Sequence, residues 1–184
     1  MAASDDESKL VELSLAGDPE AYAALVHQHQ SMIRAVAFRM TGSPDDAEEL
    51  AQDAFLRAYR QLDTFNGSSK FSTWLCKIAI NLSVDWRRRE NRRAGIHAKW
   101  AEEVAAGNDA GGGFPDELSR RVQEALNRLP PKQRAAIVLT IYENQSHAEA
   151  AKTLGCTEAT LSWRVFAARQ KLKRLLKDLP HEQT

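Results

Sequence analysis

The hydrophobic positions along the chain predict an all-α fold. Apolar residues recur at steps of three and four, which is the spacing of one helix face, and the strict alternation of a half-buried strand is absent. Glycine and proline fall where the predicted helices begin and end, as at Gly17, Asp18-Pro19, Gly42 and Ser43-Pro44. The same pattern predicts two small helical domains, residues 1–93 and 116–184, joined by a flexible linker.

The most regular helix is predicted from Asp45 to Leu62. Its core face comprises Ala47, Leu50, Ala51, Ala54, Phe55, Ala58, Tyr59 and Leu62. The other face is acidic at its start and basic at its end, which suits the helix dipole. That face is either a solvated surface or a docking surface for a basic partner. Leu56 lies outside the core face and fits the docking interpretation.

Residues 65–93 combine features of a nucleic-acid-binding element. A Gly/Ser loop precedes a helix whose predicted core face is Phe71, Trp74, Leu75, Ile78, Ala79, Leu82 and Trp86. A second flank presents Lys77, Asn81, Val84 and Arg88, and five arginines follow between positions 87 and 93. Rings, polar side chains and cations on one element are typical of surfaces that contact bases and phosphates.

The second domain ends in a predicted helix-turn-helix. Residues 94–115 lack helical periodicity and include the glycine-rich stretch at 107–113, so they are expected to form the linker. Ser146 and Glu149 form a capping box, Gly155 ends the short helix, and Thr157 caps a last helix with a basic end. In such a motif the second helix enters the major groove.

The distribution of charge distinguishes an acidic first part of the chain from a basic second part. The chain has 184 residues, 43% of them hydrophobic, and a formal net charge of zero. Residues 1–64 contain 12 acidic and 5 basic side chains, whereas residues 65–100 contain 2 acidic and 8 basic. Local fields of this kind govern association more than the sum does. The acidic N-terminus, the lack of a long apolar run and two widely separated cysteines favour a reduced, cytoplasmic protein without membrane insertion.

The residues disfavour an enzyme and leave a second class of DNA-binding protein open. An enzyme is disfavoured because His27 and His29 diverge on a helix, neither cysteine has a recognisable base, and there is no P-loop. No catalytic residue, metal or cofactor is therefore expected. A DNA-binding regulator that acts without polymerase stays open as an alternative, although it would not explain the acidic face or the loop at residues 65–70.

Three motifs resemble the extracytoplasmic-function (ECF) sigma factors of the sigma-70 family, with regions 2 and 4 only. DDAEELAQDAFLRAYRQLDTF resembles the acidic helix of region 2, and FSTWLCKIAINLSVDWRRR resembles its promoter-melting helix. LNRLPPKQRAAIVLTIYE followed by SHAEAAKTLGCTEATLSWRVFAARQKLKRLL resembles the helix-turn-helix of region 4. Each motif alone is only suggestive, but their order and the linker between them are specific.

The resemblance implies partners and sites. The partners would be core RNA polymerase (β′ coiled-coil and β flap), promoter DNA and an anti-sigma factor bound one-to-one. Polymerase would contact Asp46, Glu49, Gln52, Asp53 and Leu56. The −10 element would contact Phe65, Asn66, Gly67, Ser68, Ser69, Lys70, Lys77, Asn81, Arg87 and Arg88. The −35 element would contact Thr160, Ser162, Trp163, Arg164, Phe166, Ala167 and Arg169. Ser162, Trp163 and Ala167 replace basic or small polar residues, so these contacts would be more apolar than is usual.

Overall fold

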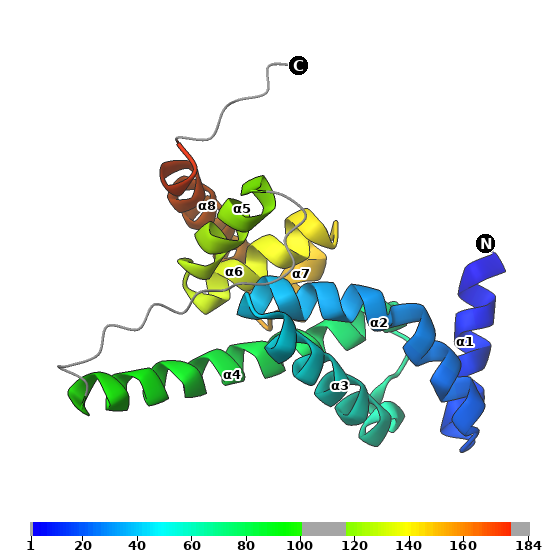
Figure 1. Ribbon diagram of the computed structural model, residues 1–184. Helices are drawn as coiled ribbons and strands as arrows, with labels where there is room; N and C mark the ends of the chain where they lie inside the picture. Colours follow the sequence, from blue (N-terminus) through cyan, green and yellow to red (C-terminus); the bar gives the residue numbers. More distant parts are fainter. Residues whose placement is uncertain (1, 101–116, 178–184) are drawn as a thin grey trace.

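The computed structural model describes residues 2–100 and 117–177, and it confirms the all-α fold: the described residues contain no strand (Figure 1). The first domain comprises α1 (Ala2–Leu15), α2 (Pro19–Thr41), α3 (Pro44–Arg60), the 3₁₀ turn η1 (Leu62–Thr64) and α4 (Phe71–Trp100). The second comprises α5 (Glu117–Asn127), α6 (Pro131–Ile137), the π-helical turn η2 (Val138–Tyr142), α7 (His147–Thr153) and α8 (Glu158–Leu175). Helix α4 extends beyond residue 93, and the glycine-rich part of the predicted linker lies outside the described residues.

Local chemistry sets the helix ends where the sequence predicted them. The Asp18 side chain accepts hydrogen bonds from the backbone N–H groups of Glu20 and Ala21, so it caps α2. Gly42 closes the same helix with a φ of +84°, a conformation that side-chain-bearing residues rarely adopt. Ser146 caps α7 through the complete capping box with Glu149. These caps fix where each helix starts and hence which face it turns inward.

The core of the first domain lies between α2, α3 and α4, with α1 packed along α2. The residues of the two predicted core faces are buried or half-buried, except for Tyr59. Tyr59 is 51% exposed, and its ring centroid lies 4.8 Å from that of Tyr22, with the two ring planes tilted by 58°. Leu62 is buried as expected, but from the 3₁₀ turn η1, because α3 ends at Arg60.

The second domain packs α6 and α7 against α8. Leu161, Val165 and Ala168 of α8 are buried against these helices, as the helix-turn-helix prediction requires. Leu118 continues the helical spacing of Val122, Ala125 and Leu129, but it lies in the first turn of α5 and is 54% exposed.

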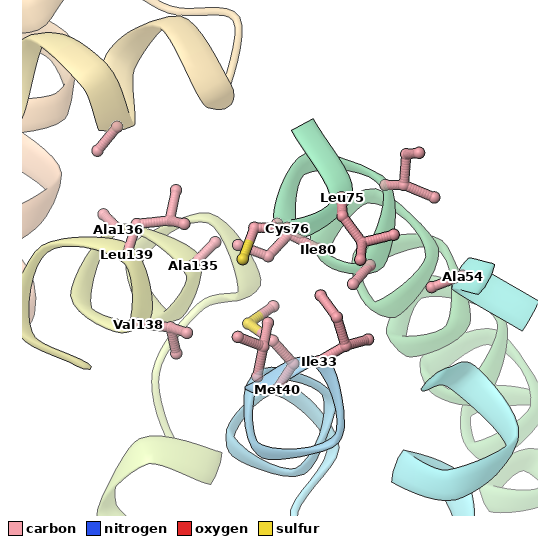
Figure 2. Packing of buried hydrophobic residues seen from close by; sticks show 14 of the residues in the cluster. Ile33, Met40, Ala54, Leu75, Cys76, Ile80, Ala135, Ala136, Val138 and Leu139 are labelled. Atoms are coloured by element: carbon pink, nitrogen blue, oxygen red, sulfur yellow. The ribbon is translucent and has the colours of Figure 1, made fainter. Parts of the chain in front are cut away.

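The two domains share one hydrophobic core, which the sequence did not predict. Buried residues of α2 and α4 meet α6 and η2 in a single cluster, and Figure 2 shows Met40, Cys76 and Ile80 facing the second domain. The facing side is lined by Ala135, Ala136, Val138 and Leu139. Alanines at this contact allow the α6 backbone to approach α4 closely.

Polar contacts reinforce this interdomain contact at the C-terminal end of α2. Arg134 of α6 is 1% exposed and donates from Nη1 to the carbonyl oxygen of Met40 at 2.5 Å. Gln123 of α5 donates to the carbonyls of Phe38 and Arg39 at 3.4 Å. The Arg39 guanidinium lies 4.1 Å from the centroid of the Tyr142 ring. We call the shared core and these contacts the closed interface.

Candidate nucleic-acid interface

The predicted polymerase-binding residues form one surface of α3. Ser43 accepts a hydrogen bond from the Asp46 backbone N–H at 3.3 Å and starts the helix, so that positions 46, 49, 52, 53 and 56 share a face. Asp46 is half-buried, and Glu49, Gln52 and Asp53 are exposed. Leu56 is 56% exposed beside them. We call these five residues the acidic surface; an apolar side chain among carboxylates suits a basic partner with an apolar patch.

The loop at residues 65–70 has a defined conformation. The Asn66 carboxamide oxygen accepts a hydrogen bond from the Ser68 backbone N–H at 3.1 Å, and Gly67 has a φ of +70°. Phe65 is half-buried, with its ring 5.5 Å from that of Phe71 and 5.4 Å from that of Trp74. The loop is thus anchored by an aromatic cluster while its polar tip stays exposed.

A cleft of about 430 Å³ opens beside this loop. The first domain lines it with Thr64, Phe65, Asn66, Ser68, Ser69, Lys70, Thr73, Trp74 and Lys77. Glu149, Lys152 and Thr153 of α7 complete the wall from the second domain. We call this the loop cleft. Polar loop groups, aromatic rings and lysines are the kinds of group with which proteins contact single-stranded nucleic acid.

Asn81 does not share the loop cleft. It lines a second cleft of about 380 Å³ between the domains, with Arg57, Asp85 and Arg88 on one side and Lys132 and Arg164 on the other. The sequence placed Asn81 beneath the loop, and the structure places it farther along α4. A base held in the loop cleft is therefore not held by Asn81 in this conformation.

Arg87 and Arg88 occupy opposite environments. Arg87 is half-buried and donates to two backbone carbonyls, that of Thr41 at 3.2 Å and that of Asn127 at 2.9 Å. Burial lowers the pKa of its guanidinium. Arg88 is exposed and lies 3.5 Å from Asp85. Arg88, Arg89 and Arg92 line a third cleft of about 630 Å³, where phosphates would reach them. Arg87, predicted as a phosphate contact, is occupied by protein carbonyls here.

Helix α8 presents an exposed aromatic pair. Trp163 is 63% and Phe166 is 62% exposed, and Arg169 is exposed one turn beyond. Thr160 lies in the first turn, where its hydroxyl is 2.8 Å from that of Thr157. The half-buried Ser162 hydroxyl lies 2.9 Å from Nδ1 of His147, a contact that the sequence did not predict.

The remaining predicted −35 contacts differ in exposure. Ala167 is half-buried beside the aromatic pair. Arg164 faces the interdomain cleft instead of the exposed side of α8.

Arg134, Gln123 and Asn127 join the two domains through hydrogen bonds that the sequence pattern did not predict. The sequence contains one indication of the buried position of Arg134: this basic residue directly precedes the apolar run Ala135–Leu139, which a buried helix would contain. Within the described residues, no group of three His, Cys, Asp or Glu side chains could hold a metal ion. None of the described helices is both long enough and apolar enough to span a bilayer.

Comparison with known proteins supports the resemblance. Residues 25–93 match the family model for Sigma-70 region 2, and residues 119–172 match that for Sigma-70, region 4. The ECF RNA polymerase sigma factor SigW of Bacillus subtilis is 34% identical, over 89% of this chain and 92% of its own length.

Two solved structures are similar over most of this chain. The sigma factor RpoE in complex with the anti-sigma factor NepR from Bartonella quintana is 30% identical, with a TM-score of 0.68 over 86% of this chain and 98% of its own. CnrH in complex with the cytosolic domain of CnrY is 28% identical, with a TM-score of 0.69 over 95% of this chain and 99% of its own. The chain therefore belongs to the non-enzymatic ECF RNA polymerase sigma factors of the sigma-70 family, with regions 2 and 4.

Proposed function

We propose that this sigma factor divides promoter recognition among three surfaces. The acidic surface of α3 docks on the β′ coiled-coil of core polymerase, and region 4 also contacts the β flap. The loop cleft captures an unpaired base of the −10 element, and α8 reads the −35 element. The observation that carries the proposal is the loop cleft, where a conformationally fixed polar loop meets aromatic rings and lysines.

Base capture accounts for melting without nucleotide hydrolysis. Extruding a base costs a few kcal/mol, which a pocket must offset after the strands part. Trp74 offers a face for stacking, and the loop offers hydrogen-bonding groups for a base edge. Lys70, Lys77 and the exposed arginines of α4 supply sequence-independent, salt-sensitive affinity for the phosphates.

The exposed rings of Trp163 and Phe166 determine which contacts α8 can make with the bases of the −35 element. Trp163 and Phe166 cannot donate bidentate hydrogen bonds to guanine, but they can pack against thymine methyl groups in the major groove. Arg169 then holds the backbone. We therefore propose a −35 element rich in thymine at the positions that face these rings.

A single substitution series tests base capture. Asn66→Ala removes the acceptor that fixes the loop, whereas Asn66→Asp keeps it. In run-off transcription with core polymerase, Asn66→Ala should lower open-complex formation, read as permanganate reactivity of −10 thymines, with unchanged polymerase binding in a pull-down. Asn66→Asp should recover part of the reactivity. Equal loss of polymerase binding would contradict a base-capturing role, and absence of any promoter-specific transcript from the unmodified protein would contradict the whole proposal.

We also propose control by an anti-sigma factor, because the similar RpoE structure contains the anti-sigma factor NepR. A partner that covers the acidic surface would compete with polymerase. Native mass spectrometry of the protein isolated from its own cytoplasm should show a one-to-one complex. Recovery with polymerase alone would contradict this part of the proposal.

A further inference from the structure

A glutamate and a histidine connect α1 to the aromatic cluster beside the loop cleft. Nε2 of His29, on α2, lies 2.9 Å from Oε1 of Glu7, on α1. The two side chains are only 13% and 26% exposed, respectively, so water competes weakly for this contact. A carboxylate only accepts hydrogen bonds, so the imidazole donates from Nε2–H. Glu7 thereby fixes the orientation of the imidazole ring.

The same imidazole ring packs against the first residue of α4. Its centroid lies 5.5 Å from that of Phe71, with the ring planes tilted by 49°. Phe71 is 2% exposed, and its ring lies 5.5 Å from that of Phe65 and 5.6 Å from that of Trp74. These separations are those of favourable aromatic pairs. His29 therefore belongs to the cluster that anchors the loop at residues 65–70.

The cluster shares two rings with the loop cleft. Phe65 and Trp74 line the cleft, whereas the buried Phe71 is not among the described residues that line it. The backbone also ties these rings to the ends of the loop: the Phe65 N–H donates to the carbonyl of Leu62 at 3.0 Å, and the Trp74 N–H donates to that of Lys70 at 3.2 Å. A shift of Phe71 would therefore move both rings and both ends of the loop.

The polar contact does more than fill space. An apolar side chain at position 29 could pack against Phe71, but it would have no bond to α1 that fixes its direction. A shielded hydrogen bond to a carboxylate sets that direction. Helix α1 also precedes residues 25–93, which match the family model for region 2. The contact thus joins a segment outside the matched residues to the proposed −10 site.

We infer that Glu7 and His29 are positioning residues for recognition of the −10 element. They act through Phe71, which holds the rings of Phe65 and Trp74 where an unpaired base would meet them. This inference rests on the proposed function of the loop cleft.

Hydrogen exchange of the free, full-length protein tests the positioning without DNA. Glu7→Ala removes the acceptor, so the loop should open more often, and exchange in peptides that cover residues 65–74 should accelerate roughly threefold or more. Glu7→Gln keeps a carbonyl oxygen at the same reach and should recover part of the protection. Glu12→Ala removes an exposed carboxylate from the same helix and should leave these rates unchanged.

Two substitutions at position 29 separate the ring from the hydrogen bond. His29→Phe keeps a ring against Phe71 but cannot donate to Glu7, whereas His29→Gln keeps a donor near Nε2 without the ring. Each should accelerate exchange in residues 65–74. His27→Phe, at an exposed position of the same helix, is the matched control and should not.

Circular dichroism identifies any variant that fails to fold. Glu7→Gln is the mildest change and still tests the direction, because a neutral acceptor should give faster exchange than the carboxylate. Unchanged exchange in the folded variants at positions 7 and 29 would overturn the inference.

Open-complex formation then links positioning to base capture. With core polymerase, Glu7→Ala should lower the permanganate reactivity of −10 thymines roughly two- to fivefold, with unchanged polymerase binding. Combined with Asn66→Ala, it should cost less than the product of the two separate losses, because both substitutions act on one loop. A loss in Asn66→Ala but none in Glu7→Ala would overturn the inference. No loss in Asn66→Ala would contradict base capture itself, and the exchange rates would still show whether α1 holds the loop.

Discussion

Two arginines show how strongly surroundings decide the role of a side chain. Arg88 projects into solvent and can meet a phosphate, whereas Arg87, its direct neighbour, donates to carbonyls of both domains. Arg134 is buried, with one hydrogen bond to the residues that the structure describes. Residue type alone predicted phosphate binding for Arg87 and nothing for Arg134. The difference arises from the carbonyls of Thr41, Asn127 and Met40, whose positions depend on the tertiary fold.

Arg134 makes a pH-dependent contribution to stability. Its pKa in the folded protein is about 9, below its ordinary value. At a pH between these two pKa values the unfolded chain binds more protons than the folded protein, so the free energy of unfolding rises with pH because of this residue. Arg134→Met should therefore stabilise the protein most near pH 7, and the gain should shrink by pH 10. Urea unfolding of both proteins at each pH measures the difference, and taking the difference cancels the titration of Cys76 and Tyr22. A gain that does not change with pH would contradict an unpaired charge at Arg134.

Single helices were largely predictable because their ends depend on local chemistry. Asp18, Ser43, Ser146 and Thr157 each cap the helix expected from the sequence. Exposure at helix edges was less predictable: Tyr59 and Leu118 continue apolar patterns beyond the point where a neighbouring helix covers them.

The capping box of α7 should be measurable on its own. Ser146→Ala removes the acceptor for the Glu149 backbone N–H and should destabilise region 4 by about 1 kcal/mol. Ser146→Gly should cost only a few tenths of that, because glycine is tolerated at this position. The free energy of unfolding in urea distinguishes the two. An unchanged free energy of unfolding in the Ser146→Ala variant would show that the hydroxyl contributes little.

The acidic surface of α3 allows a charge-reversal test at the level of the element. Asp53→Lys places a cation where a basic partner is proposed to dock, and it should weaken binding to core polymerase at least tenfold with the fold intact. Glu12→Lys on α1 makes the same charge change on an exposed residue away from that surface. Surface-bound polymerase titrated with each variant gives the comparison. Equal affinities would exclude α3 as the docking element.

At the scale of the molecule, the sequence predicted two domains but not their contact. Cys76 and Ile80 lie outside the core face predicted for the helix that follows the loop, yet they are buried in one cluster with Ala135, Ala136 and Leu139 of the second domain. Helical periodicity identifies a buried face without stating which helix covers it, so an interdomain core looks like two separate cores. For the same reason, the sequence did not show that Asn81 lies in the cleft between the domains and not beside the loop.

The charges that line the cleft between the domains should make the contact between the domains stronger at high salt. Four of the described residues that line the interdomain cleft are basic, Arg57, Arg88, Lys132 and Arg164, and one, Asp85, is acidic. Added salt screens their repulsion, so it should strengthen the contact between the domains and slow the labelling of the buried Cys76 thiol by a thiol reagent. The labelling rate between 50 mM and 500 mM sodium chloride measures this effect, with the unfolded protein as the reference. Faster labelling at high salt would show that attraction dominates the boundary.

The shared core also limits how freely the two halves can be exchanged between sigma factors. A chimaera that takes region 4 from a relative would keep a complete helix-turn-helix and a complete −10 surface. It would lose the close fit of Ala135 and Ala136 against Cys76, because larger side chains at those positions would hold the helices apart. Such hybrids should have a weaker contact between the two domains, so modular construction of sigma factors from this protein requires the facing residues to be transferred as a set.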